Sequence, residues 1–226
     1  MLMAALVVTA ITASVPFIPV STVAPVLPVV VVAIGDSTTA GTPAFRSPLE
    51  APPDGAGNVE SQYAYWLSRS HPDWRVLNRG VNGERSDQIR ARFERDALRA
   101  RPSVIVIIAG VNDVYQGRDA ASIERELEAM YDAARTAHVP VVAGTIIPFN
   151  TATLDQNARM RAVNDWIRAY AAAHSDVVFC DTRAAVAQPG NPDRLVSSPD
   201  NLHPSPDGYR LMALALEPAV KRALSL

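Results

Sequence analysis

The sequence predicts an α/β fold, a three-layer α/β/α sandwich around a five-stranded, mostly parallel sheet. Five short apolar runs rich in β-branched residues alternate with segments of helical periodicity. The run 104–109 is apolar throughout, as in a strand that is covered on both faces. Parallel strands need crossover connections, and right-handed crossovers favour a doubly wound, flavodoxin-like strand order of 2-1-3-4-5.

The first half of the chain supplies two of these strands. Val29–Ile34 is the first strand, and Trp74–Asn78 is the second. Between them, Thr42–Ser61 is rich in Pro, Gly and Ala, which predicts a long irregular loop of the kind that often covers a site. A short amphipathic helix over Gln62–Ser70 follows that loop. After the second strand, Arg79–Gly83 is a glycine-bearing loop.

The second half continues the alternation of helices and strands. Ser86 is expected to cap a helix from Asp87 to about Ala100, because Pro102 ends it, and Ser122 is expected to cap the helix that follows the third strand. The remaining segments repeat the pattern: strands at 104–109, 139–145 and 177–181, and helices at 155–173 and 206–224. Pro206 suits the first turn of the last helix.

Composition limits the classes of function. The 226 residues suit one domain, which we expect over residues 29–226. The net charge is −2 and basic residues are dispersed, so neither nucleic acid nor an anionic membrane is an expected partner. The single cysteine, Cys180, excludes an internal disulfide and lies in an apolar run, where we interpret it as a buried hydrophobic residue. Oligomeric state is not specified by the sequence.

Residues 1–28 form an uncharged N-terminal segment. Met1–Ala13 resembles the apolar part of a secretory signal, with small residues at 12–14 as cleavage positions. No Lys or Arg precedes it, however, and four prolines that follow argue against a membrane-spanning helix: Pro16, Pro19, Pro25 and Pro28. The segment is therefore either a signal peptide or an N-terminal extension. A secreted or periplasmic location is as well supported as a cytoplasmic one, and stable membrane insertion is not expected.

Three strand ends carry residues suited to chemistry. Ser37 follows the first strand, Gly80 the second and Asn112 the third. The strand order 2-1-3 makes these strands neighbours, so the three residues are expected to meet outside the carboxyl ends of the strands, where ligands bind in such sheets. The alternative is that Ser37 only caps a turn and Asn112 only satisfies nearby backbone groups.

A serine nucleophile needs a base, which is usually a histidine oriented by a carboxylate. Of four histidines, His71, His138 and His174 lie near helix ends. His203 lies in a loop after the last strand, three residues after Asp200. Within a tight loop Asp200 could accept the Nδ1 proton and leave Nε2 directed at the serine. The competing interpretation is that Asp200 caps a turn and His203 is a surface residue.

Acyl transfer also requires hydrogen-bond donors where negative charge develops on the carbonyl oxygen. Three are expected: the backbone N–H groups of Ser37 and Gly80, and the side-chain amide of Asn112. Asp36 and Asp113 are expected to shape the two turns by bonding local backbone. A metal hydrolase is disfavoured, because there is no His-x-x-x-His and one Asp-x-x-His offers too few ligands for catalytic zinc.

Four blocks of the sequence resemble those of the SGNH, or GDSL, hydrolases. They are Gly35-Asp36-Ser37, an isolated glycine at Gly80, Gly110-Val111-Asn112-Asp113 and Asp200-Asn201-Leu202-His203. The resemblance extends from about Val29 to the C-terminus, although Thr38 stands where the family often has leucine. It implies an α/β sandwich esterase or lipase without metal or organic cofactor. It also implies Ser37 as nucleophile, His203 as base, Asp200 as its orienting group, and Ser37, Gly80 and Asn112 as the oxyanion hole.

The resulting hypothesis is a serine esterase that acts on short acyl esters, such as acetyl esters, of a small molecule. No long apolar lid helix is visible, which favours a short acyl group. Residues expected to line the substrate pocket lie near these strand ends: Thr39, Asn82, Val111, Val114, Tyr115, Ile147, Phe149 and Leu202. A lysophospholipase, a thioesterase or an acyltransferase with the same triad stays open. So does a non-catalytic module that binds a glycan or small ligand on the same fold.

Overall fold

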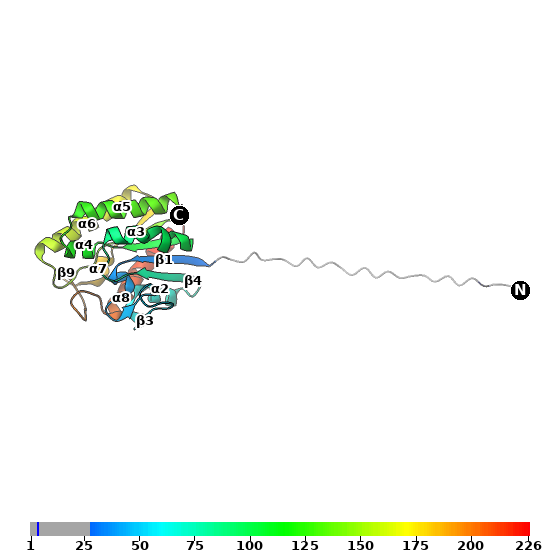
Figure 1. The fold of residues 1–226 in the computed structure, drawn as a ribbon, viewed down its shortest axis with the longest axis horizontal. Coiled ribbons are helices and arrows are strands. Elements are labelled where there is room, and N and C mark those ends of the chain that lie inside the picture. The colour runs from blue at the N-terminus through cyan, green and yellow to red at the C-terminus, as the bar shows by residue number, and fades with distance from the viewer. Residues whose placement is uncertain (1–3, 5–27) are drawn as a thin grey trace.

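The computed structural model describes residue 4 and residues 28–226 (Figure 1). The signal peptide or extension expected over residues 1–28 therefore lies, except for residues 4 and 28, outside the described residues. Within the described part of the chain, no helix combines the length and the apolar character needed to cross a membrane.

A parallel sheet of five strands forms the centre of the fold. Its strands are β1 (Val29–Gly35), β4 (Trp74–Gly80), β5 (Val104–Ile108), β6 (Val141–Gly144) and β7 (Val177–Cys180). They lie in the order β4-β1-β5-β6-β7, and every neighbouring pair is parallel. Counted along the chain, this is the predicted order 2-1-3-4-5, which is confirmed.

Helices cover both faces of the sheet, as a strand that is apolar throughout, such as β5, requires. On one face lie α3 (Ser86–Asp96), α5 (Ala120–Thr136) and α6 (Leu154–Ala173), and on the other lie α2 (Tyr63–Ser70) and α8 (Pro206–Ala223) (Figure 1). Successive residues of β1 alternate between the two hydrophobic cores. Val32 and Ile34 pack with α3 and α5, whereas Val31 and Ala33 pack with α2 and α8. The three-layer prediction is thus confirmed.

Short elements at the strand ends were not predicted. The helices α1 (Ser37–Ala40), α4 (Val111–Tyr115) and α7 (Thr182–Val186) each begin within a few residues of a strand end. The expected loops contain further short pieces: β2 (Phe45–Arg46), β3 (Ala56–Gly57), η1 (Val59–Ser61), η2 (Leu98–Ala100), β8 (Ala187–Gln188) and β9 (Asn191–Leu195). Such elements have too few residues to show a hydrophobic period in the sequence.

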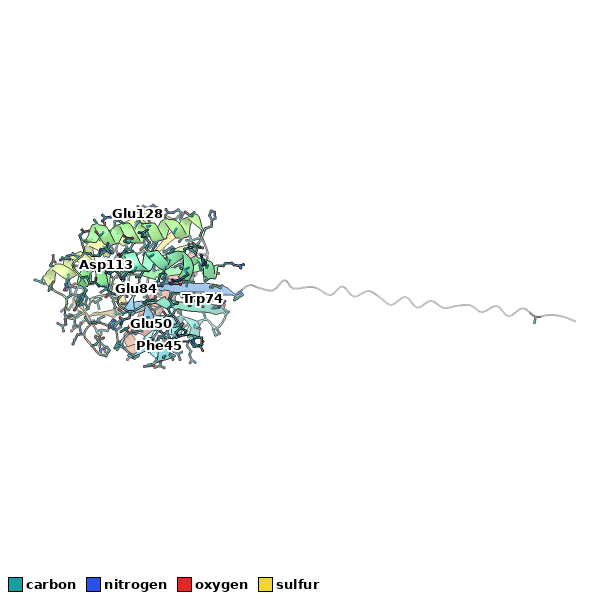
Figure 2. All side chains as sticks on the ribbon, in the orientation of Figure 1. Phe45, Glu50, Trp74, Glu84, Asp113 and Glu128 are labelled. Atoms are coloured by element: carbon teal, nitrogen blue, oxygen red, sulfur yellow. The ribbon has the colours of Figure 1, made fainter. Side chains whose placement is uncertain are left out.

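Two predicted helix caps are wrong. Ser86 is the first residue of α3 rather than its cap, because its Oγ donates to Asp113 Oδ1 at 2.8 Å. Asp119 caps α5, and its carboxylate accepts the backbone N–H of Ser122, the residue expected to be the cap. In both places a carboxylate accepts the backbone N–H of the serine itself. Figure 2 labels Asp113, and also Glu84, which follows the carboxyl end of β4.

Candidate active site

The turn after β1 presents Ser37 at the carboxyl edge of the sheet. Asp36 caps α1, and its Oδ1 accepts the backbone N–H of Thr38 at 2.9 Å. Gly35 precedes it because a Cβ there would lie 2.2 Å from the carbonyl oxygen of Ile108. Ser37 is the first residue of α1, so its own N–H has no acceptor within the helix. The turn thus directs both the hydroxyl and the N–H of this serine away from the sheet.

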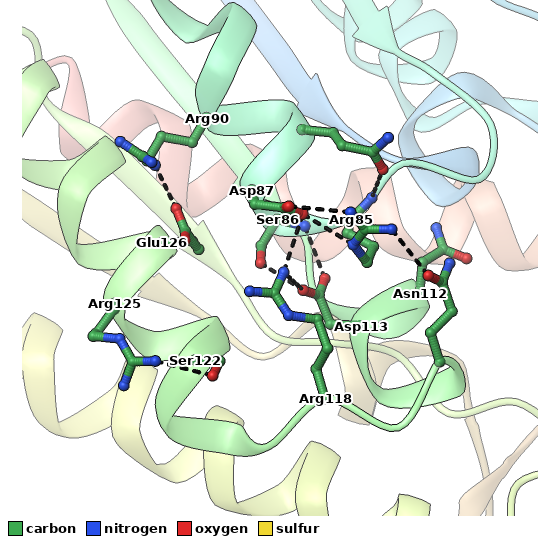
Figure 3. A network of polar contacts seen from close by, with 12 residues as sticks. Arg85, Ser86, Asp87, Arg90, Asn112, Asp113, Arg118, Ser122, Arg125 and Glu126 are labelled. Atoms are coloured by element: carbon green, nitrogen blue, oxygen red, sulfur yellow. Dashed lines mark hydrogen bonds and ion pairs between the residues drawn. The ribbon is translucent and has the colours of Figure 1, made fainter.

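Of the two aspartates beside the strand ends, Asp36 bonds local backbone as predicted, whereas Asp113 bonds Ser86, 27 residues away in the sequence. Burial raises the pKa of Asp36 to about 7, against the opposing effect of its hydrogen bonds with Thr38. Asp113 is fully buried and accepts both the backbone N–H and the Oγ–H of Ser86 at 2.8 Å, and Arg118 lies 2.9 Å from its Oδ1 (Figure 3). Asp113 therefore joins α4 to the start of α3.

His203 lies between Ser37 and Asp200. The distance from Ser37 Oγ to His203 Nε2 is 2.9 Å, and that from His203 Nδ1 to Asp200 Oδ2 is 2.7 Å. Asp200 Oδ1 also accepts the backbone N–H groups of Leu202 and His203, at 2.9 and 2.8 Å. Burial raises the pKa of Asp200, but these hydrogen bonds outweigh it, and the net effect is a pKa below the usual range. The carboxylate is therefore held in its charged form beside the imidazole.

The other three histidines take part in helix ends, as the sequence suggested. His71 and His174 follow the last residues of α2 and α6, and His138 bonds the end of α5 through its backbone N–H. None of them lines the cavity at Ser37. Cys180 is buried, and burial raises the pKa of its thiol to about 12.

Asn112 brings a side-chain donor to the same place. It lies in α4, directly after β5, and its Nδ2 donates one hydrogen to the carbonyl oxygen of Glu84 at 2.9 Å. An amide nitrogen carries two hydrogens, so the second stays available to a ligand. Asn112 and Ser37 both line one cavity.

Gly80 does not supply the donor that the sequence suggested. Its N–H donates to Asn78 Oδ1 at 2.9 Å, and it does not line the cavity. A Cβ at Gly80 would lie 2.1 Å from the backbone nitrogen of Ala40, so the glycine is required by close packing against α1.

Gly83, which the sequence reasoning missed, is better placed. Its φ is +80°, and within residues 28–226 its N–H has no hydrogen-bond acceptor. It lies between Asn82, which lines the cavity, and Glu84, which holds Asn112. The sequence did offer a signal for Gly83, which is the second glycine of the predicted loop Arg79–Gly83. Choosing between the two glycines required knowing where each peptide N–H points.

The cavity at Ser37 has a volume of about 190 Å³. Its lining comes from five separate loops and short helices: Ser37, Thr38, Asn82, Val111, Asn112, Tyr115, Phe149, Leu202 and His203. Five of the expected pocket residues are among them. Tyr115 is 60% exposed at the rim and meets Phe149 edge to face, with 6.0 Å between ring centroids. Val111, Tyr115, Phe149 and Leu202 thus form the apolar part of the lining, beside the polar side chains of Thr38 and Asn82.

Three expected pocket residues are elsewhere. Thr39 is fully buried, and its Oγ1 bonds the Tyr63 hydroxyl at 2.9 Å. Ile147 is 1% exposed and packs in the core beneath α8, and Val114 is fully buried in the other core. The loop over Thr42–Ser61 contributes no lining residue either. Thr38 takes the place expected for Thr39, because the helical turn of α1 changes which side chain faces outward.

No group of three or more His, Cys, Asp and Glu side chains within residue 4 and residues 28–226 could hold a metal ion. The cavity itself presents a serine, an imidazole and hydrogen-bond donors. A nucleophile and a base within hydrogen-bond reach, with the base oriented by a third group, is the arrangement of covalent acyl transfer.

Comparison with known proteins identifies the class. Residues 33–211 match the model of the GDSL-like Lipase/Acylhydrolase family. The chain is a carboxylic ester hydrolase. It belongs to the GDSL-like lipase/acylhydrolase family, which confirms the resemblance seen in the four sequence blocks.

An acetylxylan esterase from Geobacillus stearothermophilus is 29% identical over 154 residues, which cover 62% of this chain and 69% of that protein. Solved structures share the fold. A member of the lipolytic G-D-S-L family from Veillonella parvula superposes with a TM-score of 0.71 at 22% identity, covering 86% of this chain and 99% of that one. An acetyl-xylooligosaccharide esterase from Geobacillus gives 0.65 at 21% identity, covering 87% and 94%.

Proposed function

We propose that this family member is a serine esterase that removes short acyl groups, acetyl above all, from a small-molecule ester through an acyl-enzyme at Ser37. The observation that carries the proposal is the hydrogen-bonded series Ser37 Oγ, His203 Nε2, His203 Nδ1 and Asp200 Oδ2, with separations of 2.9 and 2.7 Å. That series opens into a cavity that also holds two amide donors. The cavity that would admit the substrate is therefore the same one that holds the activated serine.

In the proposed reaction, Ser37 Oγ attacks the ester carbonyl while His203 Nε2 accepts its proton. Asp200 keeps Nδ1 protonated and stabilises the imidazolium that forms. The tetrahedral intermediate collapses when His203 returns the proton to the leaving alcohol, which leaves the acyl group on Ser37. Water then attacks the acyl-enzyme with the same base, and the acid is released while Ser37 regains its proton.

The negative charge on the former carbonyl oxygen needs donors that are already in place. The N–H of Ser37, the second Nδ2 hydrogen of Asn112 and the N–H of Gly83 are the donors that support this role. The first two line the cavity, and Gly83 adjoins a lining residue. All three are attached to short turns that follow strand ends, which fixes them before substrate binds.

Asn112→Ala is expected to lower kcat by about 10²- to 10³-fold with KM little changed, because the lost hydrogen bond is strongest when the oxygen is charged. Steady-state kinetics on p-nitrophenyl acetate measures this effect. Asn191→Ala serves as the control, since Asn191 is an exposed asparagine that accepts the backbone N–H of Asp193 and does not line the cavity. Full kcat in Asn112→Ala would contradict the donor role.

Cavity size supports the short acyl group. Pockets for drug-sized ligands are about 300–1,000 Å³, and the cavity here is about 190 Å³. Its apolar lining suits a methyl or ethyl chain, and the exposed Tyr115 at the rim leaves room for a larger alcohol outside. The acetylxylan esterase similarity supports acetylated carbohydrate as the class of alcohol.

The test is a series of p-nitrophenyl esters from acetyl to palmitoyl, together with acetylated xylooligosaccharides. We expect kcat/KM to be highest for acetyl or propionyl and to fall steadily beyond butyryl, because longer chains cannot be enclosed. A maximum at octanoyl or longer would contradict the short-acyl proposal. Release of acetate from the oligosaccharides would support the carbohydrate class, and its absence alongside good p-nitrophenyl acetate turnover would exclude it.

A further inference from the structure

Arg92 is a buried arginine that connects two turns of the candidate site. It lies in α3, and its side chain is 6% exposed. Its Nη2 donates to the carbonyl oxygen of Gly35 at 3.0 Å, and its Nε donates to Glu84 Oε2 at 2.6 Å. Gly35 directly precedes Asp36 and Ser37, and Glu84 directly follows Gly83. One guanidinium thus spans the turn of the nucleophile and the loop of the proposed backbone donor.

The two anchor points are themselves joined to the donors. The carbonyl oxygen of Gly35 also accepts the N–H of Val81 at 3.1 Å, where the Gly83 loop begins. The carbonyl oxygen of Glu84 accepts Nδ2 of Asn112. Each proposed oxyanion donor is therefore close to a residue that Arg92 binds. Ser37 lies two residues after Gly35, Gly83 directly precedes Glu84, and Asn112 bonds the carbonyl oxygen of Glu84. Arg92 itself does not line the cavity.

The charge of Arg92 is balanced, so its burial is tolerated. Glu84 is 19% exposed on its side chain, and Asp96, which accepts from Nη1 at 3.3 Å, is 8% exposed. Asp96 is also held by Arg95 through two contacts of 2.7 Å. The planar guanidinium offers its donors in a fixed fork, which lets one side chain serve three acceptors. A lysine ammonium at this position could not reach Gly35, Glu84 and Asp96 together.

We propose that Arg92 is a positioning residue for the esterase reaction. It sets the distance between Ser37 and the donors at Gly83 and Asn112 by holding Gly35 and Glu84 in one rigid unit. This inference rests on the proposed function, because it concerns the donors named there. Misplacement of such groups by about 1 Å is enough to cost on the order of 10²-fold in rate, so a residue without substrate contact can have a large kinetic effect.

The test is the Arg92→Lys variant, with kinetics on p-nitrophenyl acetate. We expect kcat to fall about 10- to 100-fold while KM stays within about twofold, because binding of the acyl group by the apolar lining is unaffected. The Arg92→Lys and Asn112→Ala double variant should lose less than the product of the single losses, since both act through the same donors. Arg90→Lys is the matched control: Arg90 lies on α3, is 52% exposed and pairs with Glu126 (Figure 3).

Unchanged kcat in Arg92→Lys, or strictly multiplicative losses in the double variant, would overturn the inference. If Arg92→Lys does not fold, as judged by circular dichroism, the pair Glu84→Ala and Glu84→Gln decides. Glutamine keeps an oxygen for Nε of Arg92, so it should restore most of the kcat lost in the alanine variant. Equal kcat in the two Glu84 variants would contradict positioning. The inference fails separately from the proposed function, because failure of the inference leaves Ser37→Ala inactive, whereas an active Ser37→Ala contradicts the proposed function itself.

Discussion

Ser37→Ala is expected to lower kcat for p-nitrophenyl acetate by about 10⁶-fold, the effect seen when a triad serine is removed from a serine hydrolase. The reason is structural, because Ser37 Oγ lies 2.9 Å from His203 Nε2 at the mouth of the cavity. Without this hydroxyl only direct attack by water is left, and no acyl-enzyme can form. Triad members act as a unit, so Ser37→Ala combined with His203→Ala should be no slower than either variant alone.

The loss of kcat in Ser37→Ala must be distinguished from a loss of folding. Ser37 is small and 4% exposed, so alanine fits its space. Circular dichroism and thermal unfolding should match the wild type within a few degrees. Ser70→Ala changes an exposed serine at the end of α2 and should keep full activity. A Ser37→Ala variant with more than a small fraction of wild-type kcat would exclude Ser37 as the nucleophile.

Asp200→Asn is expected to lower kcat by about 10⁴-fold. An asparagine oxygen can still accept the backbone N–H groups of Leu202 and His203, which Asp200 Oδ1 now accepts, so the loop should keep its shape. The amide that replaces Oδ2 is a donor, however, and it favours the imidazole tautomer with its proton on Nε2. That tautomer cannot take a proton from Ser37.

The matched control for this change is Asp207→Asn, because Asp207 is an exposed aspartate seven residues further along the chain, in the first turn of α8. It should leave kcat unchanged. If Asp200→Asn and Asp207→Asn lose the same small amount of activity, Asp200 would be only a capping residue of its loop, which is the alternative that the sequence left open.

The sheet could be predicted because four of its strands, β1, β5, β6 and β7, are continuous apolar runs, and the strand order follows from the handedness of crossovers. The series of Ser37, His203 and Asp200 was also anticipated. A serine just after the end of β1 and an Asp-x-x-His in one loop are short-range patterns, and the fold only has to bring the two together. The family match then confirmed the class of enzyme.

The errors share a physical cause, which is the direction of individual groups within short segments. Thr38 and Thr39 are equivalent in sequence, but α1 turns the second toward Tyr63. Gly80 and Gly83 belong to one loop in the sequence prediction, and only the acceptor at Asn78 shows that the N–H of Gly80 is engaged. These choices are made by packing between distant segments, which no local pattern records.

Arg92 illustrates the same limit in a different way. It lies on its helix beside the buried Ile89 and Phe93, and a charged residue there gives no sign in the sequence of its partners. Its acceptors are 57 and 8 residues away in sequence, at Gly35 and Glu84. Only the assembled fold shows that they belong to the two turns that carry the site.

The central claim is that Ser37 forms a covalent intermediate, and labelling with a p-nitrophenyl alkylphosphonate tests it most directly. Such a reagent leaves a stable adduct on the nucleophile, which peptide mapping by mass spectrometry can locate. We predict one adduct per chain, on the peptide that contains Ser37, with loss of esterase activity in proportion to labelling and no adduct in Ser37→Ala. Inactivation with an unmodified Ser37 peptide, or an adduct on another residue, would contradict the account.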